Sequence, residues 1–149
     1  MTAADLTDHL GFWLRRVSNH VSQSFARKLA AKDVTVAEWV FLRVLQASGP
    51  TSPSRLAAEM GMTRGAISKL ADRLLAKALI ARQESGTDRR AQTLSLTAKG
   101  GRLVPVLAAL ADRNEAECFA HLPARDRAAL RRILEDTTRR LGLDALPTE

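Results

Sequence analysis

Residues 55–90 hold the side chains of this chain that are best suited to chemistry. The segment carries eight Lys or Arg residues against four Asp or Glu residues, within a formal net charge of +7 for the whole chain. The candidate contact residues are Arg55, Thr63, Arg64, Ser68, Lys69, Arg73, Asp88, Arg89 and Arg90. Cationic and hydroxyl side chains bind phosphate oxygens and base edges, so the group indicates contact with duplex DNA. Each of these residues alone is equally consistent with a solvated surface.

Two short helices are expected to carry the first part of this cluster. Ser52 is a favourable N-cap before Pro53, and the helix that follows should end at Gly61. A second helix is expected to begin at Thr63 after a tight turn. Its buried face is predicted to consist of Ile67, Leu70, Leu74 and Leu75. The pair has the form of a helix-turn-helix.

The position of each candidate on these helices suggests what it contacts. The N-terminal end of a recognition helix usually meets base edges, so we expect Thr63 and Arg64 to lie there. Lys69 and Arg73 are better placed for phosphates, and Arg55 on the shorter helix is a further phosphate candidate.

A hairpin is expected directly after the second helix. Residues 79–84 have the composition of a strand, and residues 92–96 alternate polar and apolar side chains. Gly86 supplies the turn between them. A helix beside a basic hairpin is the layout of a winged helix-turn-helix, so the predicted fold is mainly α with a small two-stranded β wing.

Longer helices flank this unit on both sides. We expect helices over residues 5–31, 35–47, 97–121 and 124–141. Thr35 with Glu38 forms a capping box at the start of the second of these, and Pro105 favours a bend in the third. Apolar spacing predicts the buried face of three of these helices. In the first helix this face consists of Leu6, Leu10, Trp13, Val17, Val21, Phe25 and Leu29. In the third it consists of Leu103, Val106, Leu107, Leu110, Ala111 and Phe119, and in the last Leu130, Ile133, Leu134 and Leu141 are expected to point inward. A first helix of about 27 residues spans about 40 Å, which is too long for one small unit to cover. A second copy of the chain is the simplest partner.

Composition narrows the class of protein further. With 149 residues and 46% apolar residues, the chain can form a folded domain with its own core. It has neither a long apolar run nor a secretory signal, so we expect a cytoplasmic protein without a membrane contact. The single cysteine, Cys118, cannot form an internal disulfide, and no Cys/His spacing fits a metal site or a cofactor.

Five short motifs, taken in order, resemble the MarR family of bacterial winged-helix regulators. They are Leu56-Ala57, Leu70-Ala71-Asp72-Arg73-Leu74, Leu79-Ile80-Ala81-Arg82, Asp88-Arg89-Arg90 and Leu96-Thr97-Ala98-Lys99-Gly100. The likeness covers residues 6–141. It implies a homodimer in which residues 1–34 and 98–149 form a helical dimerisation region, while residues 35–97 bind DNA.

The resemblance also assigns roles to the wing. It implies that Arg90 enters the minor groove and that the carboxylate of Asp88 orients its guanidinium. The family usually has Gly where this chain has Ala78. If that position requires a positive φ, the Ala costs about 1 kcal/mol. The implied function is a ligand-responsive repressor that binds a palindromic operator, with its recognition helices in the major groove.

Aromatic residues are concentrated in the first 41 residues and lie among basic ones. The resemblance implies a small phenolic or anionic effector, for which the candidate contacts are Trp13, Arg16, His20, Trp39 and Arg43. For any one of these aromatic residues, an ordinary hydrophobic core is the favoured explanation.

Catalysis has little support, because the three His residues are dispersed and no nucleophile motif or Gly-rich phosphate loop is present. We therefore predict that the chain is not an enzyme. Cys118 is expected to be a packed, inert thiol rather than a redox sensor. The alternative function is a winged-helix interaction protein that uses its basic surface for protein or membrane contact.

Overall fold

The structure is a computed structural model that describes residues 2–84 and 92–149. A short 3-10 turn, Leu6–Asp8, precedes the first long helix. The remaining elements are α1 (Leu10–Ala30), α2 (Val36–Ser48), α3 (Pro53–Met60), α4 (Arg64–Ala76), β1 (Ile80–Glu84), β2 (Gln92–Leu96), α5 (Ala98–Phe119) and α6 (Ala124–Arg140). The predicted mainly helical fold with a two-stranded antiparallel sheet is confirmed.

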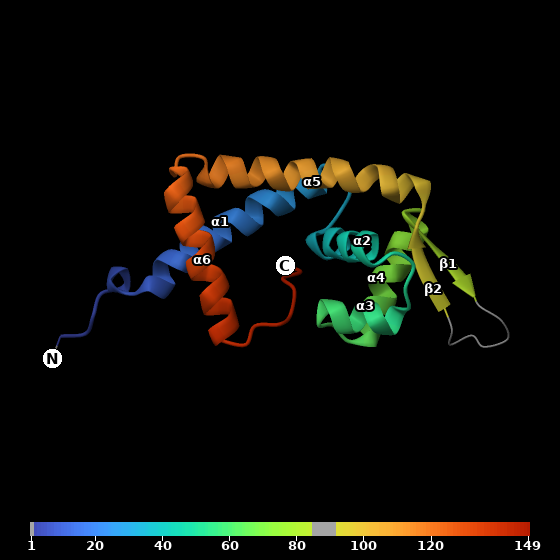
Figure 1. The fold of residues 1–149 in the computed structure, drawn as a ribbon, viewed down its shortest axis with the longest axis horizontal. Helices are drawn as coiled ribbons and strands as arrows, with labels where there is room; N and C mark the ends of the chain where they lie inside the picture. The colour runs from blue at the N-terminus through green and yellow to red at the C-terminus, as the bar shows by residue number, and fades with distance from the viewer. Residues whose placement is uncertain (1, 85–91) are drawn as a thin grey trace.

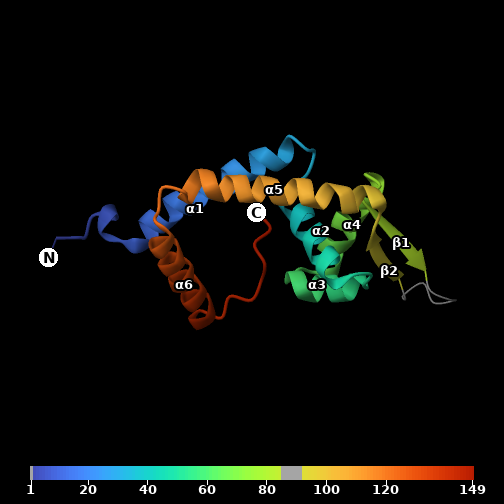
Figure 2. The same cartoon turned by 45° about the horizontal axis from the view of Figure 1, so that its top comes forward.

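The elements form a compact winged helix-turn-helix unit and three helical arms, α1, α5 and α6 (Figures 1 and 2). Helix α5 runs along the top of the molecule in Figure 1, and α1 lies alongside it. Helices α2, α3 and α4 and the hairpin gather beneath one end of α5, whereas α6 descends from its other end. Within the part of the chain that the structure describes, no helix is long and apolar enough to cross a membrane.

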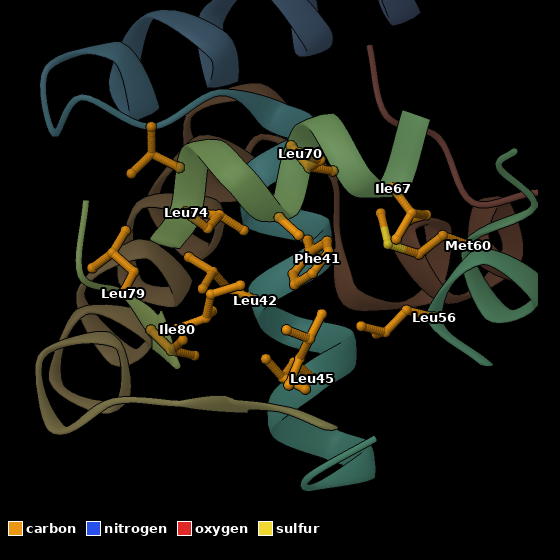
Figure 3. Packing of buried hydrophobic residues seen from close by; sticks show 14 of the residues in the cluster. Phe41, Leu42, Leu45, Leu56, Met60, Ile67, Leu70, Leu74, Leu79 and Ile80 are labelled. Carbon is orange, nitrogen blue, oxygen red and sulfur yellow. The ribbon is translucent and has the colours of Figure 1, made fainter. Parts of the chain in front are cut away.

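One hydrophobic core lies inside the winged helix-turn-helix unit. Phe41, Leu42 and Leu45 project from α2 into this core, and all three are almost fully buried (Figure 3). The residues that α4 contributes are Ile67, Leu70, Ala71 and Leu74, while Leu75 is partly buried. The predicted inner face of α4 is therefore confirmed, so its opposite face points away from the core.

The predicted helix caps are present. The Thr35 hydroxyl accepts a hydrogen bond from the Glu38 amide at 3.1 Å, and the Glu38 carboxylate accepts one from the Thr35 amide at 3.2 Å. Ser52 and Thr63 cap α3 and α4 in the same way. Gly61 ends α3 with a left-handed φ of 64°. These local signals fix the helix-turn-helix.

The first helix starts later than predicted. Instead of beginning at Asp5, α1 begins at Leu10, because His9 adopts an extended conformation. The preceding turn has its own hydrogen bonds: the Asp8 carboxylate accepts from the Asp5 amide at 2.9 Å, and the Trp13 indole donates to the Thr7 carbonyl at 2.9 Å. These bonds replace the helical ones, so apolar spacing alone misplaced the start.

The arms contradict a second prediction, that the apolar residues of the last helix point inward. Ile133, Leu134 and Leu141 are 55%, 42% and 65% exposed, and none of the described residues of α6 is buried. Helix α6 makes only sparse contact with the rest of the chain, which explains the exposure. On α5, Val104 is buried in place of Val106.

The N-terminus of α5 packs tightly on the end of α4. Ala78 has a φ of 58°, so the positive φ considered from the sequence is present. The Thr97 hydroxyl donates to the Ala78 carbonyl at 2.7 Å, and the Thr97 amide donates to the Leu79 carbonyl at 3.1 Å. The predicted strand begins one residue late, at Ile80, because the Leu79 amide donates to the Leu74 carbonyl at the end of α4 at 3.0 Å. Helix α5 continues through Pro105 without interruption.

Gly100 gives a test of this packing. A Cβ atom at Gly100 would lie 2.1 Å from the Leu79 carbonyl oxygen, which is backbone and cannot swing away. We expect Gly100→Ala to lower the free energy of unfolding by about 1–3 kcal/mol, as overpacking does. Its neighbour Gly101 faces open space, so Gly101→Ala should stabilise the helix by about 0.5–1 kcal/mol. Denaturant unfolding of both variants measures the difference, and equal stabilities would contradict the packing described here.

Candidate nucleic-acid interface

The outward face of α4 brings four of the nine predicted contact residues together. Thr63, Arg64, Ser68 and Lys69 are all exposed on this helix. Neither Arg64 nor Lys69 pairs with a carboxylate of residues 2–84 or 92–149. The Thr63 hydroxyl accepts from the Ala66 amide at 3.1 Å and can still donate. The face thus offers two cations and two hydroxyls.

The turn between α3 and α4 fixes the position of this face. The Met62 amide donates to the Ala57 carbonyl at 3.0 Å across the left-handed Gly61. Leu56, Met60 and Ile67 then join the two helices through the core (Figure 3). These contacts hold α4 against α3 and leave its opposite face exposed.

Arg73 is placed differently from the other candidates on α4. Its guanidinium donates to the Thr35 hydroxyl at 3.0 Å and to the Glu38 carboxylate at 2.9 Å. Both partners lie at the start of α2. The Arg73 side chain is still 51% exposed, so the structure leaves its predicted phosphate contact untested while giving it a partner within the chain.

Glu38 is the functional residue that sequence reasoning missed, beyond its part in the capping box. Its side chain is 1% exposed, and its second carboxylate oxygen lies 2.9 Å from the Lys77 ammonium nitrogen. That oxygen accepts no hydrogen bond among the described residues, so its contact with Lys77 is ionic. A Glu followed directly by an apolar run, residues 39–42, is the sequence signal that could have indicated this burial.

The charged state of Glu38 is stabilised by its neighbours. Burial of the carboxyl raises its pKa, but the bonds from Lys77, Arg73 and Thr35 together outweigh that effect and hold the pKa below its ordinary value. Glu38 is therefore ionised at neutral pH, and its charge compensates those of Arg73 and Lys77.

Two further cations lie on elements that adjoin α4: the predicted contact Arg55 on α3, and Arg82 on β1, which was not among the predicted contacts. Arg55 on α3 is exposed and forms a 3.4 Å ion pair with Glu59 on the next turn. Arg82, at the base of the wing, reaches Asp72 of α4 at 3.3 Å. Neither pairing is buried, so both cations can be recruited by a phosphate.

The hairpin is seen at its base. Its strands pair from Ile80 opposite Leu96 to Glu84 opposite Gln92, and Thr51 adds an isolated bridge to Leu94. The predicted wing contacts, Asp88, Arg89 and Arg90, lie outside the described residues. Their roles stay predictions.

The predicted effector residues form two separate groups. Trp13 and Phe12 flank the Arg16 guanidinium, which lies 5.7 Å from the Trp13 ring centre. Trp39 instead contacts Phe25 edge to face at 6.3 Å and carries Arg43 over its ring at 5.8 Å. Trp13 and Phe25 are separated by roughly 18 Å along α1 at the usual helical rise. One chain therefore does not bring the five predicted residues together, and His20 is exposed.

A cavity of about 420 Å³ lies beside Trp39. Phe25, Trp39 and Phe119 supply aromatic walls, and the buried Asn114 adds an amide. Its full lining is Val21, Ser22, Phe25, Val36, Trp39, Val40, Ala111, Asn114, Glu115, Phe119, Leu146, Pro147 and Glu149. The cavity lies between the arms and the winged helix-turn-helix unit, and Trp39 is the predicted effector residue that lines it.

Within residues 2–84 and 92–149, no group of three His, Cys, Asp or Glu side chains is arranged to hold a metal ion. Cys118 is a free, partly buried thiol.

Comparison with known proteins gives the family. A model described as the MarR family matches residues 32–91. An inferred transcriptional regulatory protein for the hcr operon of Thauera aromatica is 30% identical over 131 residues, which are 87% of this chain and 79% of that protein. The HTH-type transcriptional repressor Rv2887 of Mycobacterium tuberculosis is 29% identical over 135 residues, which are 91% of this chain and 94% of the repressor.

Solved structures share the fold. The Rv2887 protein in complex with DNA matches with a TM-score of 0.72 and 26% identity, covering 87% of this chain and 97% of that one. Bordetella bronchiseptica BpsR, whose DNA binding is regulated by 6-hydroxynicotinic acid, matches with a TM-score of 0.76 over 92% of this chain and 98% of its own. Its identity of 23% shows the fold alone.

Ionised Glu38 makes stability depend on pH in a defined direction. Because its pKa is lowered in the folded chain, its stabilising effect is complete above the ordinary carboxyl pKa and is lost as pH falls through the folded value. Glu38→Gln should therefore cost about 1–3 kcal/mol at pH 7. The gap from the parent should begin to narrow as pH falls below the ordinary carboxyl pKa of about 4.3, because the unfolded chain then binds a proton that the folded chain does not.

Denaturant unfolding at several pH values checks this prediction. Asp112→Asn, which neutralises an exposed carboxylate on α5, is the control and should change stability little. A gap between Glu38→Gln and the parent that is as large at pH 3.5 as at pH 7 would contradict the ionic role.

Proposed function

The chain belongs to the MarR family of DNA-binding transcriptional regulators, and we propose that it acts as a homodimeric, ligand-responsive repressor of an inverted-repeat operator. Each α4 enters a major groove in this mechanism. Arg64, Ser68 and Thr63 meet base edges near the N-terminus of the helix, while Lys69 and Arg55 contact phosphates.

The observation that carries this proposal is the outward face of α4. Helix α4 is buried on one side and presents Arg64 and Lys69 on the other, and neither cation has a carboxylate partner among the described residues. Such a face is suited to binding a polyanion. The relatives named above as regulator and repressor support the same function. The alternative, a protein that uses the face only for protein or membrane contact, has no comparable support.

The arms supply the proposed dimerisation region, formed by residues 1–34 and 98–149. Leu10, Trp13 and Val17 on α1 are 88%, 48% and 47% exposed, and Ile133 and Leu134 on α6 are exposed as well. Such apolar faces are rarely left in water, so a second copy is the expected cover. A two-fold dimer would present two α4 helices to the two halves of one site.

The wing completes the proposed contact. Residues 35–97 form the DNA-binding region, and Arg90 is assigned to the flanking minor groove with Asp88 orienting its guanidinium. An Arg gains most where A·T-rich sequence narrows that groove.

The cavity beside Trp39 is the proposed effector site. Its aromatic walls suit a small planar ligand, and a ligand there would alter the spacing of the two DNA-binding units. We further propose that the chain acts in the cytoplasm and catalyses no reaction.

Selection of bound duplexes from a random pool tests the proposed function. The selected sequences should form inverted repeats whose half-sites lie about 10 bp apart, since a two-fold protein binds a two-fold site. Failure to enrich any sequence, with no protection of duplex DNA from nuclease, would favour the interaction protein instead.

Lys69→Ala tests the phosphate contact on α4. We expect weaker binding to the selected duplex and to a random duplex alike, with the slope of log affinity against log salt reduced by about 1. Lys32→Ala removes an equal charge from the loop before α2 and should leave both quantities unchanged. Loss of affinity for the selected duplex alone would show that Lys69 contacts bases.

Variants of the wing test its two assigned roles. Arg90→Ala should cost about 1–3 kcal/mol of binding and weaken the preference for A·T-rich flanks. Arg90→Lys should recover part of that loss, because an ammonium lacks the planar donor geometry. Asp88→Ala should loosen binding if the carboxylate orients Arg90. Tighter binding of Asp88→Ala to one fixed duplex would instead mean that simple charge repulsion dominates.

A further inference from the structure

We propose that Glu38 is a positioning residue that sets the rotation of α4 in the groove by binding Arg73 and Lys77 simultaneously. The inference rests on the proposed DNA-binding function. It assigns Arg73 to a contact within the chain rather than to a DNA phosphate.

The geometry of the contact is that of a two-point clamp. Arg73 and Lys77 lie one helical turn apart, so their side chains leave α4 on the same side. Arg73 binds one oxygen of the Glu38 carboxylate at 2.9 Å, and Lys77 binds the other at 2.9 Å. A hydrogen bond from Arg73 and an ion pair from Lys77, the residue that caps the C-terminus of α4, thus meet at a single buried carboxylate and constrain both the rotation of the helix and its position along its axis.

Neighbouring bonds hold the clamp in place from both sides. The Thr35 hydroxyl also accepts from Arg73 at 3.0 Å, and the Lys77 ammonium donates to the Asp33 carbonyl. Lys99 of α5 in turn donates to the Lys77 carbonyl at 3.0 Å. The C-terminal half of α4 is therefore tied to α2 and α5, whereas its N-terminal half carries the DNA-facing Arg64 and Ser68.

Burial of the Glu38 carboxylate removes its hydration, and this unfavourable free energy offsets much of the stability that its ion pairs contribute. A buried ion pair often contributes no more than well-packed apolar residues of similar volume, but it accepts only one geometry. The apolar core beneath α4 resists separation of the helices more than it resists a small rotation, because dispersion contacts have no strong direction. A directional ionic clamp supplies the missing constraint on which face of α4 meets the DNA.

The proposal predicts a loss of selectivity rather than a uniform loss of affinity. Base contacts require an accurately rotated α4, while random duplexes are held mainly by phosphate contacts that tolerate a shift. Glu38→Gln and Arg73→Gln should each lower affinity for the selected duplex about tenfold, and change affinity for a random duplex less than about twofold. The double variant should be no weaker than the weaker single variant, because both substitutions break the same contact.

The salt dependence of Arg73→Gln separates positioning from phosphate binding. A residue that contacts a phosphate contributes about 1 to the slope of log affinity against log salt, whereas a positioning residue leaves the slope unchanged. Arg73→Lys keeps the charge but loses the planar guanidinium. It should retain the salt slope and still lose part of the selectivity.

The experiment measures binding of the full chain to the selected and random duplexes over a range of salt. Thermal unfolding and far-UV circular dichroism establish that each variant is folded, and Arg73→Lys carries the test if Glu38→Gln is not. Glu117→Gln is the matched control, because it breaks another interhelical ion pair, to Lys28 at 2.7 Å, on the arms. It should leave the ratio of the two affinities unchanged.

Three results would overturn the inference while leaving the proposed function intact. These are a reduced salt slope for Arg73→Gln, additive losses in the double variant, and an unchanged affinity ratio in folded Glu38→Gln. Failure of the parent protein to bind any duplex would instead refute the proposed function, and the inference with it.

Discussion

Burial of one face of α4 against α2 is the interaction on which the rest of the structure depends. Phe41, Leu42 and Leu45 meet Ile67 and Leu74 in a core that excludes water almost completely (Figure 3). Each such side chain contributes about 1.5–3 kcal/mol when it is fully buried. Because the inner face of α4 is committed to this core, its polar residues must point outward. Helix α3, the hairpin and α5 pack around the same hydrophobic core. The exposed face of α4 and the clamp at Glu38 both follow from this packing.

The arms show the opposite balance of burial. Helix α1 has only Ser24 and Leu29 buried, and α6 has no buried residue among those described, although both helices are amphipathic. Apolar surface of this extent on α1 and α6 is expected to be covered by another protein surface in water. A second copy meets that need without a further gene product, and it also doubles the number of α4 helices on one duplex. Dimerisation and recognition of a two-fold site thus follow from the same excess of apolar surface.

Much of the fold could be predicted because its signals are local. Caps at Thr35, Ser52, Thr63 and Thr97 and the helix end at Gly61 depend on neighbours in sequence, and each is present in the structure. The second strand is present too, although only Leu94 of its residues is fully buried. A positive φ at Ala78 was raised only as a condition, from the family resemblance, and the structure meets that condition. The sequence did not reveal features that depend on distant residues. The competing turn before Leu10, the outward apolar face of α6 and the burial of Glu38 by α4 all involve partners that spacing along the chain does not disclose. The predicted effector residues lie in two separate groups for the same reason: Trp13 and Trp39 are both aromatic residues beside an Arg, but they lie on different helices and make different contacts.

The composition of the protein–DNA complex tests the account most directly. Light scattering during size-exclusion chromatography, performed on the full chain with a single selected duplex, gives the number of chains bound to each duplex. The account predicts two chains for each duplex, and also two chains in the free protein, with no folded single chain on dilution. A stable single chain that binds the selected duplex as tightly as the mixture does would contradict it, because the exposed faces of α1 and α6 would then need no partner.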